Sequence, residues 1–354
     1  MQSVALTAAT HRRDSTAAMN AEHLTRLRHD AVNGNPFAER LLLLHWLQSD
    51  QPDAIETYLD DRNNATHRSY VIAELTCFHG WPSSSSWPDL LQECAEKGHS
   101  EAGQVVRLYH DWARHSGQLP VDHDNYDCSD PNWHAWQPPA WTTAAYGNDV
   151  SVETSAAFIP RSLIAYVRAL LSPQLKPSVV VDPETGQAIA HPVRINRAAQ
   201  WFPEALGWIG KLFECRLAIT GGYAVENAEV SSLLHYTPGQ RYKAHYDCIP
   251  LKQLEAENGN EQGGQRTQTL LLALGDDRYQ GGETAFPHLG ARVRTQVGEL
   301  MRFNNTDKTG EPNRASLHEG TPVTAGEKWL LSKWVREAPT PYGRELNLRC
   351  DATS

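Results

Sequence analysis

Two residues with metal-ligand chemistry stand one residue apart in the stretch "LLHYTPGQRYKAHYDCIP", residues 233–250. They are His245 and Asp247, and they form the only His-x-Asp of the chain. In extended backbone, residues i and i+2 point to the same side, so one imidazole and one carboxylate can reach a single ion. His318 is the candidate for a third ligand. It would complete the two-His-one-carboxylate set that binds non-haem Fe(II) and leaves coordination positions open. Without that third ligand, the pair also fits a polar patch on a strand.

A lysine follows His318 after ten residues, in the segment "EKWLLSKWVRE" that has the character of a strand. Because an unpaired buried cation is costly, Lys328 in the apolar setting "KWLL" indicates a negatively charged partner. A compact ammonium suits the far carboxylate of a dicarboxylate whose 2-oxo acid end is bound at the metal. A surface lysine is the plain alternative.

Residues 155–338 resemble the prolyl 4-hydroxylase branch of the 2-oxoglutarate- and Fe(II)-dependent dioxygenases. The resemblance rests on "HYTPGQRYKAHYD", "GGETAFP", "GELMRFNN" and "HEGTPVTAGEKWLLSKWVR", in the order and spacing of the family. More loosely, "RINRAAQWF" looks like the first strand of the family's domain. The resemblance implies that His245, Asp247 and His318 are the iron ligands and that Lys328 pairs with 2-oxoglutarate.

Further candidates surround these four residues. For cosubstrate binding they are Tyr236, by its match to the family, and Thr269 on the strand "TQTLLLALG". For the wall of a substrate pocket they are Trp334, Arg194 and Asn304. Ala273 stands where the family commonly has a tyrosine, and this departure puts the substrate in doubt more than the iron chemistry.

The reaction implied by the resemblance is hydroxylation of an aliphatic C–H, with a peptidyl proline as the expected target. Fe(II), 2-oxoglutarate and O2 are the expected cofactor and cosubstrates, succinate and CO2 the products, and a need for ascorbate stays open. The polar, Gly-rich segment 248–268 directly follows the metal pair and has the length of a functional lid or of an ordinary loop.

The elements that must position these residues change character along the chain. Residues 21–117 have helical periodicity, and "LLQECAEKGHSEAGQVVRLY" resembles one Sel1-like helical repeat, with a small helical cap as the alternative. From about 154, two helices, the second expected in "AAQWFPEALGWIGKLFECRLAIT", are followed by short strands between Gly, Asn and Asp turns. We therefore expect an α+β chain with a double-stranded β-helix (jelly roll), buttressed by helices and preceded by an all-α region.

The predicted boundaries are a disordered leader at 1–20, a helical region at 21–117 and a linker at 118–153. The dioxygenase domain is predicted at 154–340 and a tail at 341–354. A chain of 354 residues with 40% hydrophobic residues can bury cores of this size.

Charge and cysteine content limit the partners and the compartment. The net charge of −10 argues against general binding to nucleic acid. No apolar run reaches the length of a membrane span, and no signal peptide is predicted. Six scattered cysteines without Cys-x-x-Cys indicate neither a disulfide framework nor a cysteine zinc site, and they favour the cytoplasm. A peptide or protein substrate is expected, and a small molecule stays open.

Three other functions remain as alternatives. The first is a hydroxylase of a free amino acid or small metabolite in the same fold. The second is a helical-repeat scaffold protein whose iron site is vestigial. A zinc hydrolase that uses His and Asp ranks last, because it would leave Lys328 without a purpose.

Overall fold

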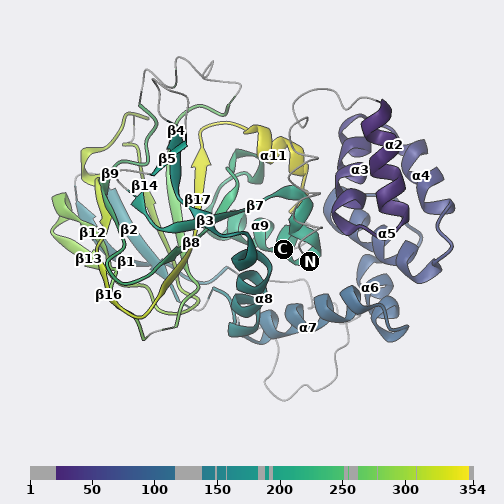
Figure 1. Ribbon diagram of the computed structural model, residues 1–354, viewed down its shortest axis with the longest axis horizontal. Coiled ribbons are helices and arrows are strands. Elements are labelled where there is room, and N and C mark those ends of the chain that lie inside the picture. The colour runs from purple at the N-terminus through teal and green to yellow at the C-terminus, as the bar shows by residue number, and fades with distance from the viewer. Residues whose placement is uncertain are drawn as a thin grey trace.

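The protein is described by a computed structural model, which covers residues 21–115, 138–147, 150–156, 158–181, 188–190, 194–250, 254, 262–276, 278–307 and 309–350. Helices fill the N-terminal part of the chain and strands most of the remainder. In Figure 1 the helices α2–α6 lie to one side of the molecule, the strands lie on the other, and α8 and α9 stand between them. The expected order of an all-α region followed by a β domain is confirmed.

Within residues 21–115, which the structure describes, six helices form the N-terminal region and pack mainly against their neighbours in sequence. Their bounds are Ala21–Val32 (α2), Pro36–Gln48 (α3), Pro52–Asp60 (α4), Ala65–His79 (α5), Trp87–Glu96 (α6) and Ser100–His115 (α7). Gly98 has φ +81°, a left-handed conformation that ends the turn after α6 and lets α7 begin at Ser100. The segment that resembles a Sel1-like repeat is therefore one helix–turn–helix unit, and the repeat itself stays a prediction.

Two sheets carry the second half of the chain. The large sheet has the order β1-β2-β14-β10-β17-β8-β7-β3, and the small sheet has the order β13-β12-β15-β9-β6. The strands of the large sheet are β1 (Thr142–Gly147), β2 (Val150–Ser155), β3 (Lys176–Pro177), β7 (Arg197–Trp201), β8 (Ser231–Tyr236), β10 (Arg266–Ala273), β14 (Leu300–Asn304) and β17 (Lys328–Arg336). Those of the small sheet are β6 (Arg194–Ile195), β9 (Arg241–His245), β12 (Thr284–Phe286), β13 (Ala291–Val293) and β15 (His318–Gly320). The short strands β4 (Val179–Val181) and β5 (Ala188–Ala190) pair with each other, as do β11 (Gln280–Gly281) and β16 (Val323–Ala325).

The chain crosses repeatedly from one sheet to the other. From β8 to β10 the strands alternate between large and small sheet, and β14, β15 and β17 repeat this alternation. As a result β17, the last strand, lies between β8 and β10 in the large sheet, and β15 lies between β9 and β12 in the small one. This double-sheet topology is the expected jelly roll.

Two segments differ from the sequence-based expectation. Residues 142–147 and 150–155, at the end of the expected linker, are strands β1 and β2. Strand β1 is the edge of the large sheet, and β2 lies between β1 and β14. The long helix α9 begins only at Pro203, because the preceding residues form β7 and pair with β8. Apolar residues that alternate over one short strand resemble a helical start, so sequence alone did not separate the two elements.

Helix α9 (Pro203–Gly221) joins the two halves. Nearly all its side chains are buried, since the helical region covers one side and the large sheet the other. One hydrophobic cluster extends from Leu27 in α2 through α9 to Leu348 near the C-terminus. Trp208 of α9 packs against Tyr70, Phe78 and Trp87 of the helical region, with ring centroids 5.5–5.9 Å apart. The helical region and the jelly roll therefore share one core.

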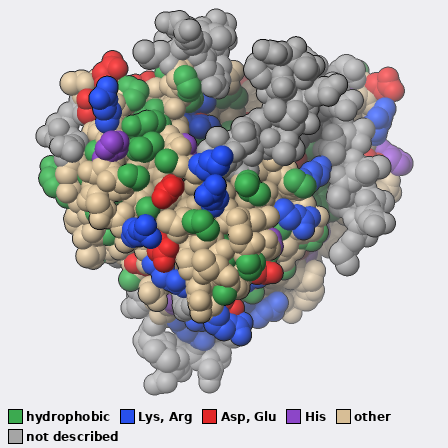
Figure 2. Space-filling view, turned by 60° about the vertical axis from the view of Figure 1, so that its left-hand side comes forward, with side chains coloured by type: hydrophobic (Ala, Val, Ile, Leu, Met, Phe, Trp, Pro, Cys, Tyr) green, Lys and Arg blue, Asp and Glu red, His purple; other side chains and the backbone are tan. Residues whose placement is uncertain are grey.

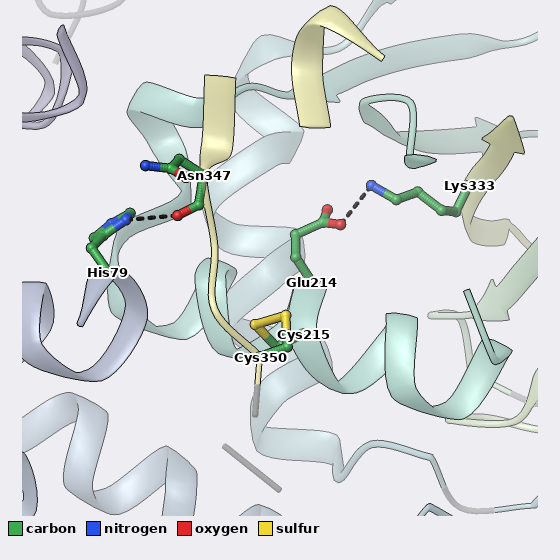
Figure 3. Close-up of a disulfide and its surroundings, with 6 residues drawn as sticks. All are labelled: His79, Glu214, Cys215, Lys333, Asn347 and Cys350. Carbon is green, nitrogen blue, oxygen red and sulfur yellow. Dashed lines mark hydrogen bonds and ion pairs between the residues drawn. A yellow bond between two sulfur atoms is a disulfide. The ribbon is translucent and has the colours of Figure 1, made fainter. Parts of the chain in front are cut away.

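The C-terminal segment is bonded to α9 and contacts α5 of the helical region. It forms α11 (Pro341–Leu346), and then Cys350 makes a disulfide with Cys215 of α9 (Figure 3). His79 of α5 contacts the carbonyl oxygen of Asn347 at 3.0 Å. The expectation from scattered cysteines is corrected by this bond: two cysteines 135 residues apart come together because α9 and the C-terminus lie side by side.

Among the described residues, no helix combines the length and the apolar character that crossing a membrane requires. On the face drawn in Figure 2, Lys and Arg side chains occupy several separate places between acidic and hydrophobic ones.

Candidate metal and cosubstrate site

The three candidate metal ligands meet where two neighbouring strands of the small sheet end and begin. His245 is the last residue of β9, His318 is the first residue of β15, and the two are direct partners in the antiparallel ladder. Asp247 follows β9 and lies between them: its Oδ1 is 3.5 Å from Nε2 of His245, and its Oδ2 is 3.5 Å from Nε2 of His318. One donor atom from each residue lies within 4.8 Å of the others. The structure thus brings the predicted triad together.

Backbone carbonyls orient both imidazoles. Nδ1 of His245 is 2.8 Å from the carbonyl oxygen of Lys243, and Nδ1 of His318 is 3.0 Å from that of Ser316. Because a carbonyl oxygen only accepts, each Nδ1 carries a proton, and Nε2 is the ring nitrogen that can bind a metal. Two imidazoles and one carboxylate facing one point are the donor set that fits a divalent iron.

The carboxyl group of Asp247 is buried and ionised. Burial alone would raise its pKa, but His318, His245 and the hydroxyl of Thr269 outweigh that effect and hold the pKa below the usual range. Thr269 donates to Oδ2 of Asp247 at 2.6 Å. The observed contact of Thr269 is therefore with the metal carboxylate, while its predicted hydrogen bond to a cosubstrate stays a prediction.

Lys328 and Tyr236 lie opposite each other on β17 and β8, in the same cavity as the triad. The ammonium of Lys328 is 5.7 Å from the ring centroid of Tyr236 and donates to the carbonyl oxygen of Gly282 at 2.5 Å. Burial lowers the pKa of Lys328 to about 8, and the nearby Glu283 only partly opposes this. The ammonium has a carbonyl but no carboxylate within ion-pair distance among the described residues, which suits an anionic ligand.

The cavity that contains these groups is lined by apolar and small polar side chains. Besides the triad, Tyr236, Lys328 and Trp334, it is lined by Leu234, Tyr242, Leu271, Thr284, Gly320, Leu330 and Ser332. The indole Nε1 of Trp334 is buried without a hydrogen-bond partner. Such an orphaned donor at a cavity wall is a point at which a ligand can bind.

Sequence reasoning missed all seven of these further lining residues, among them Tyr242, Thr284 and Ser332. The ring of Tyr242 stacks on His245 with centroids 3.5 Å apart, although the two residues are three positions apart and would point to opposite faces of a regular strand. The register between β9 and β15 shifts between these positions, and this irregularity brings both rings into the cavity. Ser332 follows the alternation of Lys328, Leu330 and Trp334, so period two would have identified it.

The other predicted pocket residues lie less centrally. The side chain of Asn304 is exposed, and its neighbour Asn305 is fully buried and contacts Thr269. Arg194 pairs through its backbone with Tyr242, and its side chain lies outside the described residues. Ala273 is buried in a small cluster with Tyr236 and Leu330.

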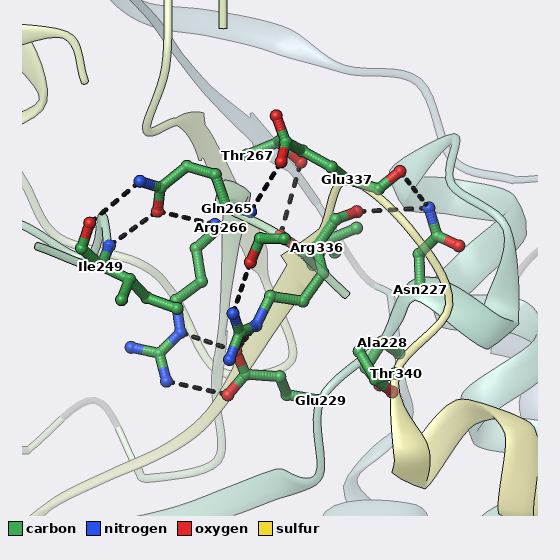
Figure 4. Close-up of polar contacts among 12 residues, drawn as sticks. Asn227, Ala228, Glu229, Ile249, Gln265, Arg266, Thr267, Arg336, Glu337 and Thr340 are labelled. Atoms are coloured by element: carbon green, nitrogen blue, oxygen red, sulfur yellow. Dashed lines mark hydrogen bonds and ion pairs between the residues drawn. The ribbon is translucent and has the colours of Figure 1, made fainter. Parts of the chain in front are cut away.

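A network of ion pairs among Arg266, Glu229 and Arg336 (Figure 4) borders Trp334. The guanidinium of Arg266 lies 3.7 Å from the ring centroid of Trp334 and makes two hydrogen bonds to Glu229, at 2.7 and 2.8 Å. Glu229 also pairs with Arg336. The network therefore fixes one face of the tryptophan that walls the cavity.

The base of the segment 248–268 is fastened beside this network. The side chain of Gln265 accepts from the backbone of Ile249 at 2.6 Å and donates to its carbonyl oxygen at 3.0 Å. These bonds hold the two ends of the segment together. Residues 251–253 and 255–261 lie outside the described residues, so the lid remains a prediction.

Comparison with known proteins agrees with this geometry. Residues 231–336 match the family model of the 2OG-Fe(II) oxygenase superfamily. Prolyl 4-hydroxylase 1 of Arabidopsis thaliana is 32% identical over 195 residues, which are 49% of this chain and 65% of that protein. Prolyl 4-hydroxylase subunit alpha-1 of Rattus norvegicus is 30% identical over 52% of this chain and 34% of its own length. The chain thus spans less than two thirds of either relative.

Among solved structures, the viral collagen prolyl hydroxylase of Paramecium Bursaria Chlorella virus-1 in its 2OG complex is similar with a TM-score of 0.40. The two chains are 23% identical, and the match covers 52% of this chain and 95% of the viral one.

Proposed function

Residues 231–336 belong to the 2OG-Fe(II) oxygenase superfamily, and from this premise we propose that the protein is a hydroxylase of peptidyl proline that uses Fe(II) and 2-oxoglutarate. The observation that carries the proposal is one cavity that contains both a His-Asp-His donor set and a buried lysine without a carboxylate partner. A metal site alone would need no such cation. A dicarboxylate-binding site alone would need no such donors.

Each residue of the cavity has a role in this proposal. His245 and His318 hold the iron through Nε2 and Asp247 holds it through a carboxylate oxygen. Lys328 pairs with the far carboxylate of 2-oxoglutarate, with Tyr236 beside it. The bound iron and cosubstrate supply the oxidising power for C–H hydroxylation, with succinate and CO2 as products.

The remaining side chains orient these groups and exclude water. Tyr242 holds the ring of His245 by stacking, and the apolar side chains of Leu234, Leu271 and Leu330 keep the cavity dry. Trp334 walls the cavity beside the Arg266–Glu229 pair. No residue needs to act as a general base, so the protein's contribution is binding and positioning.

A prolyl target is supported by the names of the relatives, which are prolyl 4-hydroxylases. A solved prolyl hydroxylase from Trichoplax adhaerens has been crystallised with a peptide fragment. We therefore propose a proline-containing peptide or protein as the substrate, with ascorbate as an auxiliary reductant to be tested.

A cytoplasmic location belongs to the proposal as well, and the Cys215–Cys350 bond provides its test. Disulfides are rare in reducing compartments. The protein should be isolated from cells under a thiol-blocking reagent and its free thiols counted. Two free thiols at positions 215 and 350 would support the cytoplasm, and a bonded pair would favour an oxidising compartment.

Succinate formation from 2-oxoglutarate tests the activity. The purified protein is assayed with Fe(II) in air, with and without a proline-rich peptide, alongside His245→Ala, Asp247→Ala and the exposed control His288→Ala. We expect peptide-stimulated turnover that both site variants lose and the control keeps, together with a peptide mass increase of one oxygen atom.

Other outcomes separate the alternatives. Stimulation by free proline or another small metabolite, with none by peptide, would replace the peptidyl substrate. No turnover, together with no binding of Fe(II) or 2-oxoglutarate, would contradict the enzyme and favour the scaffold protein.

A further inference from the structure

A chain of hydrogen bonds leads from the carboxylate of Asp247 to a buried amide that no metal would touch. Oγ1 of Thr269 is 2.6 Å from Oδ2 of Asp247, and Nδ2 of Asn305 is 2.9 Å from the same Oγ1. Thr269 is 1% exposed and Asn305 is 0% exposed. Because both side chains are shut off from water, the orientation of each depends on its protein partners.

The number of protons fixes the direction of this chain. A threonine hydroxyl has one proton, and its shortest contact, at 2.6 Å to a carboxylate oxygen of Asp247, is the bond in which it donates. The lone pairs of the hydroxyl are then left to accept, and only the NH2 group of Asn305 can donate to them. The oxygen of the Asn305 amide also lies 3.3 Å from Thr269 Oγ1, but the single proton is already used in the shorter bond.

The backbone of Asn305 supports a second ligand of the same site. Its carbonyl oxygen accepts from the backbone N–H of Asn313 at 3.0 Å, and the carbonyl oxygen of Asn313 accepts from the hydroxyl of Ser316 at 2.7 Å. The carbonyl of Ser316 in turn accepts from Nδ1 of His318. Asn305 therefore lies at the base of the excursion between β14 and β15, the one that delivers His318.

We propose that Asn305 and Thr269 are positioning residues for the metal: Asn305 orients the Thr269 hydroxyl, and that hydroxyl sets the rotation of the Asp247 carboxylate toward the two histidines. The inference rests on the proposed function only in that the site holds a divalent metal. It assigns a function to the second asparagine of "RFNN", which is buried next to the exposed Asn304. Loss of such outer partners typically weakens metal affinity by about 10–100-fold.

The test measures Mn(II) affinity by electron paramagnetic resonance, without oxygen or turnover, on protein whose folding is checked by its thermal midpoint. Thr269→Val keeps the side-chain volume and removes the hydroxyl, and we expect it to weaken Mn(II) binding about 10–100-fold. Thr269→Ser restores the hydroxyl and should return affinity to within about threefold of wild type. Thr220→Val, a buried threonine on α9, is the matched control and should bind as wild type.

The double variant decides whether Asn305 acts through Thr269. Asn305→Ala should weaken Mn(II) binding about 5–10-fold, and adding it to Thr269→Val should cause no further loss, because its target hydroxyl is already absent. Wild-type affinity in both single variants, or losses that multiply in the double variant, would overturn the inference while leaving the enzyme proposal intact. A wild-type protein that binds neither Mn(II) nor Fe(II) would overturn both.

Discussion

Strand β17 buries two lysines, one on each of its faces, and their surroundings differ. Lys333 points to the α9 face, where its ammonium lies 2.6 Å from a carboxylate oxygen of Glu214 (Figure 3). Lys328 points to the cavity face, where it donates to a backbone carbonyl and, within the part of the chain that the structure describes, has no carboxylate at that distance. Burial lowers the pKa of both. A buried charge with a partner belongs to the fold, and a buried charge that lacks a partner anion beside metal donors indicates a ligand.

The same contrast holds for the rest of the two faces. On α9, Lys211 pairs with Glu74 at 2.7 Å, and Glu214 also accepts from Ser231 and Tyr342. In the cavity, the donors of the triad converge on one point. The helix face pairs these charges within the chain, whereas under the proposed function metal and cosubstrate would complete the cavity face.

The largest loss of stability is expected when the buried ion pair between Lys333 and Glu214 is broken. Lys333→Met leaves the carboxylate of Glu214 buried without its cation, which should lower the free energy of unfolding by about 3–5 kcal/mol. Urea unfolding measures it. Adding Glu214→Gln should recover part of the loss, since the uncompensated charge is then removed.

Removal of the cavity lysine should weaken ligand binding without lowering the stability of the ligand-free protein. Lys328→Met should weaken 2-oxoglutarate binding about 100-fold, because the far carboxylate loses its partner in a dry site. The apo protein should unfold at equal or higher denaturant concentration than wild type, since a buried cation has been removed. Calorimetric titration of the Mn(II)-loaded protein with 2-oxoglutarate measures the affinity. Unchanged binding would contradict the assigned role of Lys328.

Proton linkage provides a smaller test of the same lysine. With a pKa of about 8 in the empty site, Lys328 loses its charge as the pH rises from 7 to 9, so 2-oxoglutarate affinity should fall about 10-fold. In Lys328→Met this dependence should disappear.

The contribution of Lys328 to the free energy of unfolding of the ligand-free protein should become more favourable as the pH rises, whereas the 2-oxoglutarate affinity falls. The unfolded lysine titrates at 10.5, so between pH 8 and 10.5 the unfolded chain binds a proton that the folded chain does not. The destabilising effect of Lys328 is therefore present in full below pH 8 and fades as the pH rises to 10.5. Urea midpoints of wild type and Lys328→Met should approach each other across that range.

The smallest change in the free energy of unfolding is expected at an ion pair with an exposed carboxylate. Glu327, next to Lys328 in the chain, has a side chain that is 54% exposed and lies 3.1 Å from His235. Glu327→Gln should change the free energy of unfolding by less than about 1 kcal/mol, because solvent screens an exposed pair. An effect as large as that of Lys333→Met would mean that the distance between two charges, and not their burial, determines how much stability is lost.

The sequence predicted the parts of the site whose chemistry restricts residue type. His245, Asp247, His318 and Lys328 stand in motifs whose spacing the jelly roll requires, and the structure places them in one cavity. Strand alternation could also have distinguished Asn305 from Asn304, since Met301 and Phe303 of β14 are buried on the inner side and Asn305 continues their series.

Other features depended on tertiary contacts that no local pattern encodes. Tyr242 reaches His245 only through an irregular strand register. The strand β7 looked like the start of α9 until its pairing with β8 was known. The pairing of Cys215 with Cys350 needs the C-terminal segment to lie against α9, which six scattered cysteines do not reveal.

That disulfide also changes the connectivity of the molecule. It closes a covalent ring from position 215 to position 350, and the ring contains β8, β17 and all three metal ligands, whereas the helices α2–α7 hang outside it. A single proteolytic cut anywhere inside the ring leaves both pieces covalently attached, so the nicked protein would migrate as one species until a reductant separates it. A cut between α7 and α9 lies outside the ring, so this disulfide would not hold the two pieces together. The residues of the candidate metal site therefore stay within one covalent molecule after a single backbone break inside the ring.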